Sequence, residues 1–183
     1  SPFSHGIVGY ELLLKEYGLV ANMILHSPMT YFKGKVGSLE DAGFEPEEFL
    51  KLPTLGPHLR RHGITPYAFQ HYNIAHSGLS RMFMQDVNIE PFESPAELWV
   101  NLRQLHEHTS GERMYNWVYW GHVDGLSHHY HPDDERVLAE FKSFSYAFEE
   151  FFLKPSRAST LKDTLLILTA DHGQIYTPDN PSF

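Results

Sequence analysis

Two runs of strand-forming residues in this chain each end in an acid and a histidine, and this repetition most constrains the fold. The first run, residues 114–119, is aromatic and β-branched, and Asp124 and His128 follow it. The second run, residues 164–169, is continuously apolar or β-branched and leads directly into Asp-His-Gly at 171–173. Such a run predicts a strand covered on both faces. Each predicted strand would aim potential metal ligands out of its end.

A helix is predicted between the two runs, after Pro132. Residues 133–135 are acidic, and acids in a first turn are favoured by the partial positive charge of a helix N-terminus. Strand, helix and strand in this order predict a right-handed crossover between parallel strands, whose C-terminal ends share one edge of the sheet. Ligands of open α/β sheets bind along that edge. We therefore expect Asp124 and Asp171 to face one crevice.

The same helix carries apolar residues at steps of three and four positions, which predicts one buried aromatic face. Its members are Val137, Phe141, Phe144, Phe148 and Phe151. Stacking on a cofactor is the alternative use of such a face, and core packing is the interpretation we adopt.

The remaining elements predict an α/β fold with a mostly parallel sheet flanked by helices. Ser94, Pro95 and Glu97 are typical of a helix start, with an N-cap, a proline in the first turn and a capping box, and that helix should end near His108. The other predicted elements are strands at 10–14 and 19–25, loop with short irregular helices at 27–53, a helix at 54–62 stopped by Gly63, and a strand at 64–69. Without repeats or a long linker, residues 1–183 are expected to form a single, partial domain.

Composition limits the partners of such a domain. With 183 residues and 42% hydrophobic content, the chain can bury a core. A net charge of -9 disfavours binding of extended nucleic acid, whereas a small anionic substrate remains compatible if bound cations invert the local potential. No apolar stretch approaches the roughly 18–20 residues of a membrane span. Cysteine is absent, so thiolate metal sites are excluded.

The acid and histidine pairs have the donor chemistry of a site for two divalent metal ions. Asp124 and His128 could offer an oxygen and a nitrogen to one cation, and Asp171 and His172 could do the same for a second. These donors suit Zn²⁺, Mn²⁺ or Fe, and Mg²⁺ less well because of the imidazoles. The alternative is that each pair caps a helix or fixes a turn. That alternative suits one isolated pair better than two pairs at equivalent strand ends.

Three segments together resemble the alkaline phosphatase superfamily, and most closely its type I phosphodiesterase and nucleotide pyrophosphatase branch. They are His-Gly-Ile-Val-Gly at 5–9, Asp-Gly-Leu-Ser-His at 124–128 and Thr-Ala-Asp-His-Gly at 169–173. The resemblance implies an alkaline phosphatase-like core and a zinc ion at each acid and histidine pair. It also implies hydrolysis of phosphate esters by a two-step displacement through a covalent phospho-enzyme.

Two parts of that family's site are not matched. Its Ser or Thr nucleophile and a further metal-binding Asp precede the segment at 5–9, and its last His ligand follows the Asp-His-Gly segment by a long interval. The nucleophile is therefore expected outside this chain, since Ser1 and Ser4 do not fit its motif. This mismatch keeps three alternatives open: a catalytically inactive metal-binding or structural homologue, a sulfatase, and a phosphoglycerate mutase-type member of the superfamily.

Residues near position 75 could bind the small phosphoester substrate. Asn73, Ser77 and Arg81 precede or open a short predicted helix and could contact an anion. The alternative is a solvated helix start. Asn73 and Arg81 are the candidates that we retain for substrate binding.

Overall fold

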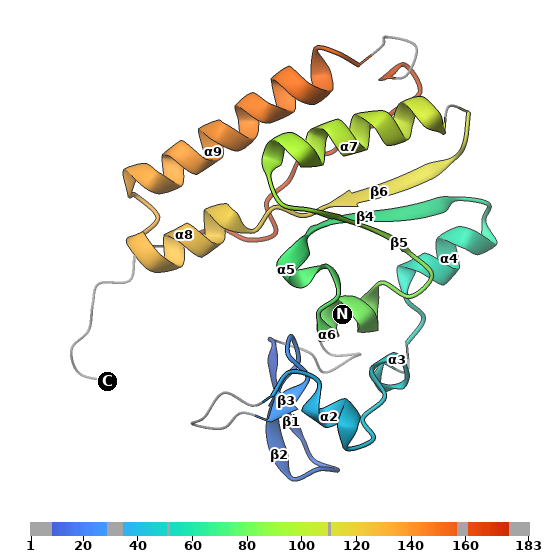
Figure 1. Cartoon of the computed structure of the whole chain (residues 1–183), viewed down its shortest axis with the longest axis vertical. Helices are drawn as coiled ribbons and strands as arrows, with labels where there is room; N and C mark the ends of the chain where they lie inside the picture. The colour runs from blue at the N-terminus through green and yellow to red at the C-terminus, as the bar shows by residue number, and fades with distance from the viewer. Residues whose placement is uncertain (1–8, 29–34, 51, 110, 157–160, 176–183) are drawn as a thin grey trace. The chain divides into compact units, whose positions relative to one another are not determined.

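The protein is described by a computed structural model that divides into two compact units (Figure 1). The structure describes residues 9–28, 35–50, 52–109, 111–156 and 161–175. Unit 1 comprises 1–91 and 112–118, and unit 2 comprises 92–111 and 119–183. The single domain expected from the sequence stays a prediction.

Unit 1 begins with a small antiparallel sheet, ordered β1-β2-β3. Its strands are β1 (Glu11–Leu14), β2 (Leu19–Asn22) and β3 (Ser27–Pro28). The predicted strand at 19–25 ends early, at Asn22, because the carboxamide oxygen of Asn22 accepts hydrogen bonds from the backbone N–H groups of Ile24 and Leu25. An Asn side chain that bonds to the backbone just ahead of it turns the chain out of a strand.

Two short helices and part of α6 complete the core of this sheet. They are α2 (Ser38–Asp41), α3 (Pro46–Phe49) and α6 (Gly78–Phe83), and the first two confirm the short irregular helices predicted in 27–53. The core side chains are Leu14, Ala21, Met23, Leu39, Phe44, Leu50 and Met82. A side chain at Gly78 would collide with the ring of buried His26. Only glycine at this position therefore allows the start of α6 to pack directly against that ring.

The second sheet of unit 1 is ordered β5-β4-β6, and β4 and β6 are parallel. The strands are β4 (Thr65–His71), β5 (Asn88–Phe92) and β6 (Met114–Val118). They confirm the strands predicted at 64–69 and 114–119. Helices α4 (Leu55–Arg61) and α5 (Tyr72–Ala75) lie against β4. The α/β class with parallel strands and flanking helices is therefore confirmed.

Strand β5 was not predicted from the sequence. Its Asn-Ile-Glu-Pro-Phe sequence neither alternates cleanly nor avoids proline, which cannot donate to a sheet. β5 lies at one edge of the three-stranded sheet, where a proline is tolerated. Its pairing with β4 is thus a tertiary effect that the local pattern does not contain.

Unit 2 is helical. Its elements are α7 (Pro95–His108), α8 (His122–Tyr130), α9 (Glu135–Phe148) and the π-helical turn η1 (Glu149–Leu153). The predicted start of α7 is confirmed, since Ser94 Oγ accepts from the backbone N–H of Glu97 at 3.2 Å. The carboxylate of Glu97 accepts from the N–H of Glu93 at 2.8 Å, so the capping box closes one residue earlier than in the standard pattern.

An aromatic cluster joins α7, α9 and η1. The ring of Trp99 lies 5.3 Å from that of Phe144, 4.6 Å from that of Phe148 and 5.7 Å from that of Phe152. The prediction of core packing is confirmed for Phe144 and Phe148. It is wrong for Phe141, which is 53% exposed, and it named Phe151 where Phe152 is the buried residue. The cause is η1, because a π-helical turn takes up an extra residue and shifts the helix face by one position.

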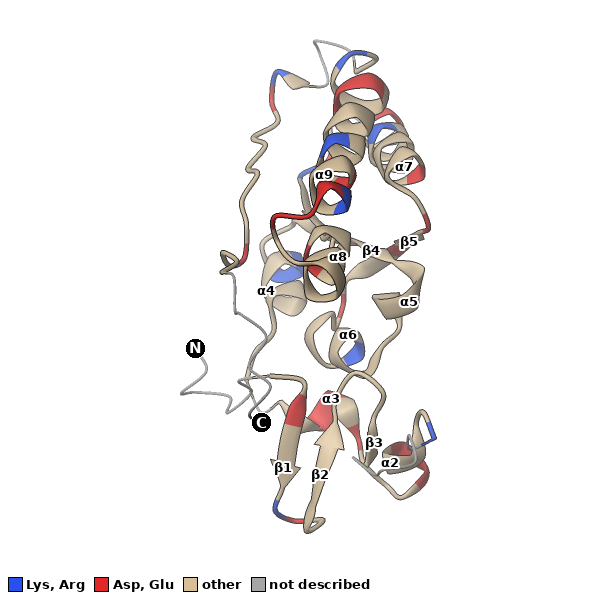
Figure 2. Cartoon of the chain, turned by 90° about the vertical axis from the view of Figure 1, so that its left-hand side faces the viewer, with Lys and Arg blue, Asp and Glu red and all other residues tan. Residues whose placement is uncertain are grey.

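The strand predicted at 164–169 is absent from the structure. The segment has no regular secondary structure, and Leu165, Ile167 and Leu168 are each at least 71% exposed. Figure 2 draws it as extended coil. The run has the composition of a buried strand, but a strand forms only when a neighbour accepts its backbone hydrogen bonds, and no described strand pairs with it. The predicted crossover through this strand is therefore wrong for the structure.

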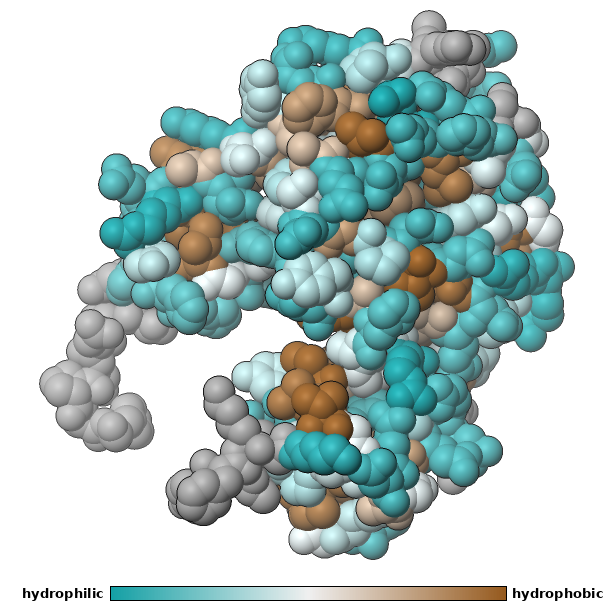
Figure 3. Space-filling model, in the orientation of Figure 1, coloured by the Kyte–Doolittle hydropathy of each residue, from teal (hydrophilic) through white to brown (hydrophobic). Residues whose placement is uncertain are grey.

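The described surface also carries small groups of apolar side chains among hydrophilic ones (Figure 3). On α9 these include Leu138, Phe141 and Tyr146. Within the described parts of the chain, no helix combines the length and the apolar character that crossing a bilayer requires.

His106 gives unit 2 an expected pH dependence. It is buried on α7 with its ring edge-on to that of Phe152, and burial lowers the pKa of its imidazole below the usual value. The unfolded chain then binds this proton more readily than the folded one, so stability falls as pH drops below about 6.5, the pKa of an unperturbed histidine. We expect the free energy of unfolding to be lower at pH 5 than at pH 7.5.

Urea denaturation across this pH range measures the effect. His106→Gln should flatten part of the slope, and His108→Gln, at an exposed position of the same helix, is the matched control. An unchanged slope in His106→Gln would contradict the assignment.

Candidate metal centre

Asp124 and His128 lie on one face of α8. The sequence predicts only that they follow a strand, and in the structure α8 begins at His122, immediately after the N-cap Gly121. Residues four apart on a helix are neighbours, and the Nε2 atom of His128 lies 3.5 Å from Asp124 Oδ2. The pair is thus held by a helical backbone, which is a rigid support.

Asp171 and His172 form a turn in the coil segment that follows residue 163. The backbone N–H of His172 donates to Asp171 Oδ1 at 3.1 Å, and its Nδ1 lies 3.0 Å from the carbonyl oxygen of Gly173. The opposite ring nitrogen, Nε2, lies 3.8 Å from Asp171 Oδ2 and 4.0 Å from Asp124 Oδ1. The two acid and histidine pairs therefore meet, although the predicted strand edge does not bring them together.

The two carboxylates act on nearby titratable groups. The Gly173 carbonyl, together with Asp171 and Asp124, raises the pKa of the His172 imidazole above its usual value. Burial, with a contribution from the same two carboxylates, raises the pKa of the Tyr119 phenol. Both carboxylates thus act on the His172 ring, which lies within 4.0 Å of an oxygen of each, and two negative charges around one place favour a bound cation.

Donor type and spacing fit a divalent cation. The Nε2-to-carboxylate distances of 3.5–4.0 Å exceed those of hydrogen bonds, and are close to the roughly 3.4 Å that separates two ligands of a tetrahedral Zn²⁺ ion. The Nδ1 contact of His172 with the Gly173 carbonyl leaves Nε2 as the ring nitrogen on the side of Asp124 and Asp171. Among the described residues no three His, Asp or Glu side chains are arranged to hold one ion, so each ion would need further ligands.

Trp120 fixes the start of α8. Its ring stacks on those of His122 at 4.2 Å and Phe92 at 5.8 Å, and its Nε1–H donates to Glu140 Oε1 at 3.0 Å. Glu140 belongs to α9, so this hydrogen bond joins the segment that leads into α8 to the next helix. His122, one of the histidines beside the first pair in sequence, has its ring in this stack.

The two residues predicted to bind substrate lie in unit 1. Asn73 is exposed on α5, directly after the C-terminal end of β4. Arg81 on α6 is engaged by two acids, since its guanidinium donates to Glu40 and, at 3.1 Å, to Glu47. The substrate-binding role of both residues stays a prediction.

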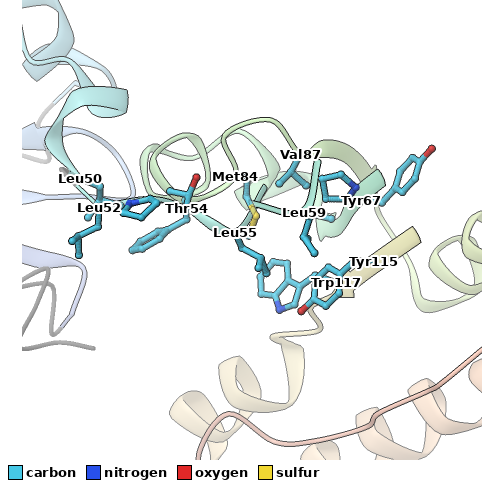
Figure 4. A pocket seen from close by; sticks show the side chains of 14 residues that line it. Leu50, Leu52, Thr54, Leu55, Leu59, Tyr67, Met84, Val87, Tyr115 and Trp117 are labelled. Atoms are coloured by element: carbon cyan, nitrogen blue, oxygen red, sulfur yellow. The ribbon is translucent and has the colours of Figure 1, made fainter. Parts of the chain in front are cut away.

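Unit 1 also contains an apolar cavity of about 400 Å³ (Figure 4). Leu55 and Leu59 of α4, Met84, and Tyr115 and Trp117 of β6 contribute to its lining. None of the six candidate site residues lines it. Its mainly apolar wall provides no charged group that could bind a phosphoryl oxygen.

Three residues near the two pairs were not identified from the sequence. Tyr119 was assigned only to the end of a strand, and Ser127 only to the spacer between Asp124 and His128. Gln174 follows the Asp-His-Gly segment, and its carboxamide contacts both Asp124 and Ser127. Adjacency to the two acid and histidine segments was the only sequence signal for any of them.

The chain belongs to the type I phosphodiesterase / nucleotide pyrophosphatase family, because the sequence model of that family matches residues 1–183. This membership confirms the resemblance to the alkaline phosphatase superfamily. Searches of curated proteins and of solved structures gave no match. Ser1, Ser4 and most of the 5–9 segment lie outside the described residues.

Proposed function

We propose that the protein is a metal-dependent hydrolase of phosphate esters, of the phosphodiesterase or nucleotide pyrophosphatase type. Two divalent ions, Zn²⁺ in the first instance, would be held by Asp124 with His128 and by Asp171 with His172. The nucleophile would be a Ser or Thr hydroxyl. Membership of the family supports the reaction class, and the residues of unit 2 support the metal site.

The meeting of the two acid and histidine pairs carries this proposal. His172 Nε2 lies within 4.0 Å of carboxylate oxygens from both Asp124 and Asp171, which are far apart in the sequence. A pair that only capped a helix or fixed a turn would not need the other pair beside it.

Each residue has a definite task in this mechanism. Bound cations would supply positive charge for the attacking and leaving oxygens of an in-line displacement at phosphorus. The Nδ1–H of His172 would donate a hydrogen bond to the Gly173 carbonyl, so that Nε2 would be the ring nitrogen presented to a cation. Tyr119, whose phenol pKa is raised, stays protonated at neutral pH and can donate a hydrogen bond. The helical backbone under Asp124 and His128 limits the reorganisation that binding requires.

Three chromogenic esters with the same leaving group test the proposal on the full-length protein. They are bis(p-nitrophenyl) phosphate, p-nitrophenyl phosphate and p-nitrophenyl sulfate. We expect the diester to be hydrolysed with the highest kcat/KM, EDTA to abolish the reaction, and Zn²⁺ or Mn²⁺ to restore it.

The other outcomes separate the alternatives. A preference for the sulfate ester would instead support a sulfatase. No turnover of any ester, with metal still bound, would support an inactive homologue. Undiminished turnover after complete removal of metal would contradict the proposed mechanism.

A further inference from the structure

We propose that Gln174 is a positioning residue, which ties the Asp171-His172-Gly173 segment to α8 and orients the carboxylate of Asp124. The inference rests on the proposed metal-dependent function and adds to it a residue outside the predicted ligand set. It is carried by two hydrogen bonds from one carboxamide to neighbouring turns of α8.

The carboxamide of Gln174 forms one hydrogen bond as a donor and one as an acceptor. Its Nε2 donates to Asp124 Oδ1 at 3.3 Å, and its Oε1 accepts from Ser127 Oγ at 2.8 Å. The orientation follows from chemistry, because an ionised carboxylate only accepts hydrogen bonds and must face the NH₂ group. Turning the amide over would place its oxygen against the carboxylate.

Ser127 gives this link a fixed end. Its side chain is buried on α8, and its hydroxyl also lies 2.7 Å from the carbonyl oxygen of Val123. The single hydroxyl proton is shared between this carbonyl and Gln174. A side chain held to its own helix in this way makes a rigid reference point for Gln174.

The link also sets the direction of Asp124. The N–H of Gln174 occupies Oδ1, while Oδ2 faces His128 Nε2 at 3.5 Å. Holding one oxygen limits rotation of the carboxylate and keeps the other directed at the histidine. This is the arrangement in which hydrogen-bonding partners of metal ligands raise affinity, and their loss costs about 10–100-fold.

The segment that carries His172 depends on this link because it has no regular secondary structure. Residues 164–175 are in no helix or strand, and residues 171–175 are exposed. Gln174 holds this coil to α8 through its two side-chain hydrogen bonds. Its loss should therefore separate the two acid and histidine pairs even without metal.

Substitutions at Gln174 and Ser127 in the full-length protein test the inference. Gln174→Met keeps length and removes both hydrogen bonds, Gln174→Glu sets a second carboxylate against Asp124, and Ser127→Ala removes one partner. Gln104→Met, at an exposed position of α7, and Ser145→Ala, whose hydroxyl bonds a carbonyl one turn back on α9, are the matched controls.

Two measurements are needed. In metal-free protein, amide hydrogen exchange at residues 172–174 should be faster in Gln174→Met than in wild type. Titration with Mn²⁺, followed by electron paramagnetic resonance, should show affinity lowered about 10–100-fold in Gln174→Met, lowered more in Gln174→Glu, and unchanged in both controls.

The outcomes distinguish this inference from the function on which it rests. Wild-type protein that takes up no Mn²⁺ or Zn²⁺ would overturn the proposed function. Wild-type uptake, together with unchanged affinity and unchanged exchange in Gln174→Met, would overturn the role of Gln174 alone.

Discussion

Replacing Asp124 by alanine is expected to lower kcat/KM for phosphodiester hydrolysis by the full-length protein about 1,000-fold. Charge stabilisation by a bound metal contributes several kcal/mol to such reactions, and about 1.4 kcal/mol corresponds to a factor of ten in rate. Asp124 is the most connected of the candidate ligands, because its two oxygens face His128, His172 and Gln174.

The same substitution should weaken Zn²⁺ binding by more than about 100-fold. Loss of a hydrogen-bonding partner of a ligand already costs about 10–100-fold, and loss of the ligand itself should cost more. Competition with a chromophoric chelator measures the affinity. A loss of activity without a loss of metal would contradict the ligand role.

Asp133→Ala is the matched control for Asp124→Ala. Asp133 is an exposed acid of unit 2 that precedes the N-cap of α9, so its removal changes the net charge equally. Activity and metal affinity of this variant should stay within about twofold of wild type. A comparable loss in Asp133→Ala would assign the effect to general charge.

Replacing Trp99 by alanine is expected to destabilise the protein by about 3–5 kcal/mol, the range typical of a buried tryptophan truncated to alanine. Trp99 is 4% exposed, and its ring contacts those of Phe144, Phe148 and Phe152. Truncation would leave a cavity between α7, α9 and η1 that three large rings cannot fill. Denaturant unfolding monitored by circular dichroism measures the loss.

Trp99→Phe is the control for loss of the ring. The indole N–H of Trp99 is buried without a hydrogen-bond partner among the described residues, so phenylalanine gives up no polar contact. We expect a cost of about 1 kcal/mol, which reflects the smaller ring. Trp99→Ala costing no more than Trp99→Phe would refute a central role for this cluster.

Elements with strong local signals could be predicted from the sequence. Helix α7 has an N-cap serine, a proline at its first position and the predicted end at His108. Strands β4 and β6 have the expected β-branched or aromatic composition. In each case the residues that decide the structure lie within the element or beside it.

Pairing between distant segments could not be predicted from local pattern. β5 forms against β4 despite Pro91, whereas residues 165–169 form no strand with any described segment despite an ideal composition for one. The composition of a segment indicates whether it suits a buried strand. Whether the strand forms depends on a partner strand that accepts its hydrogen bonds.

The proximity of the two acid and histidine pairs could be predicted from the sequence, but not the elements that bring them together. Asp124, His128, Asp171 and His172 do meet, as expected, but through a helix and a coil. Their roles as ligands stay predictions. The contribution of Gln174 depends on the side-chain geometry of both segments, which no spacing rule encodes.

The extra residue in η1 has a consequence for insertions and deletions in this region. A π turn changes the rotational phase of the residues that it contains, and η1 runs from Glu149 to Leu153. Removing one residue within η1 would leave α9 intact upstream but rotate the residues at the end of the turn by about 100°. The number of residues in this short turn therefore decides whether Phe151 or Phe152 packs against Trp99.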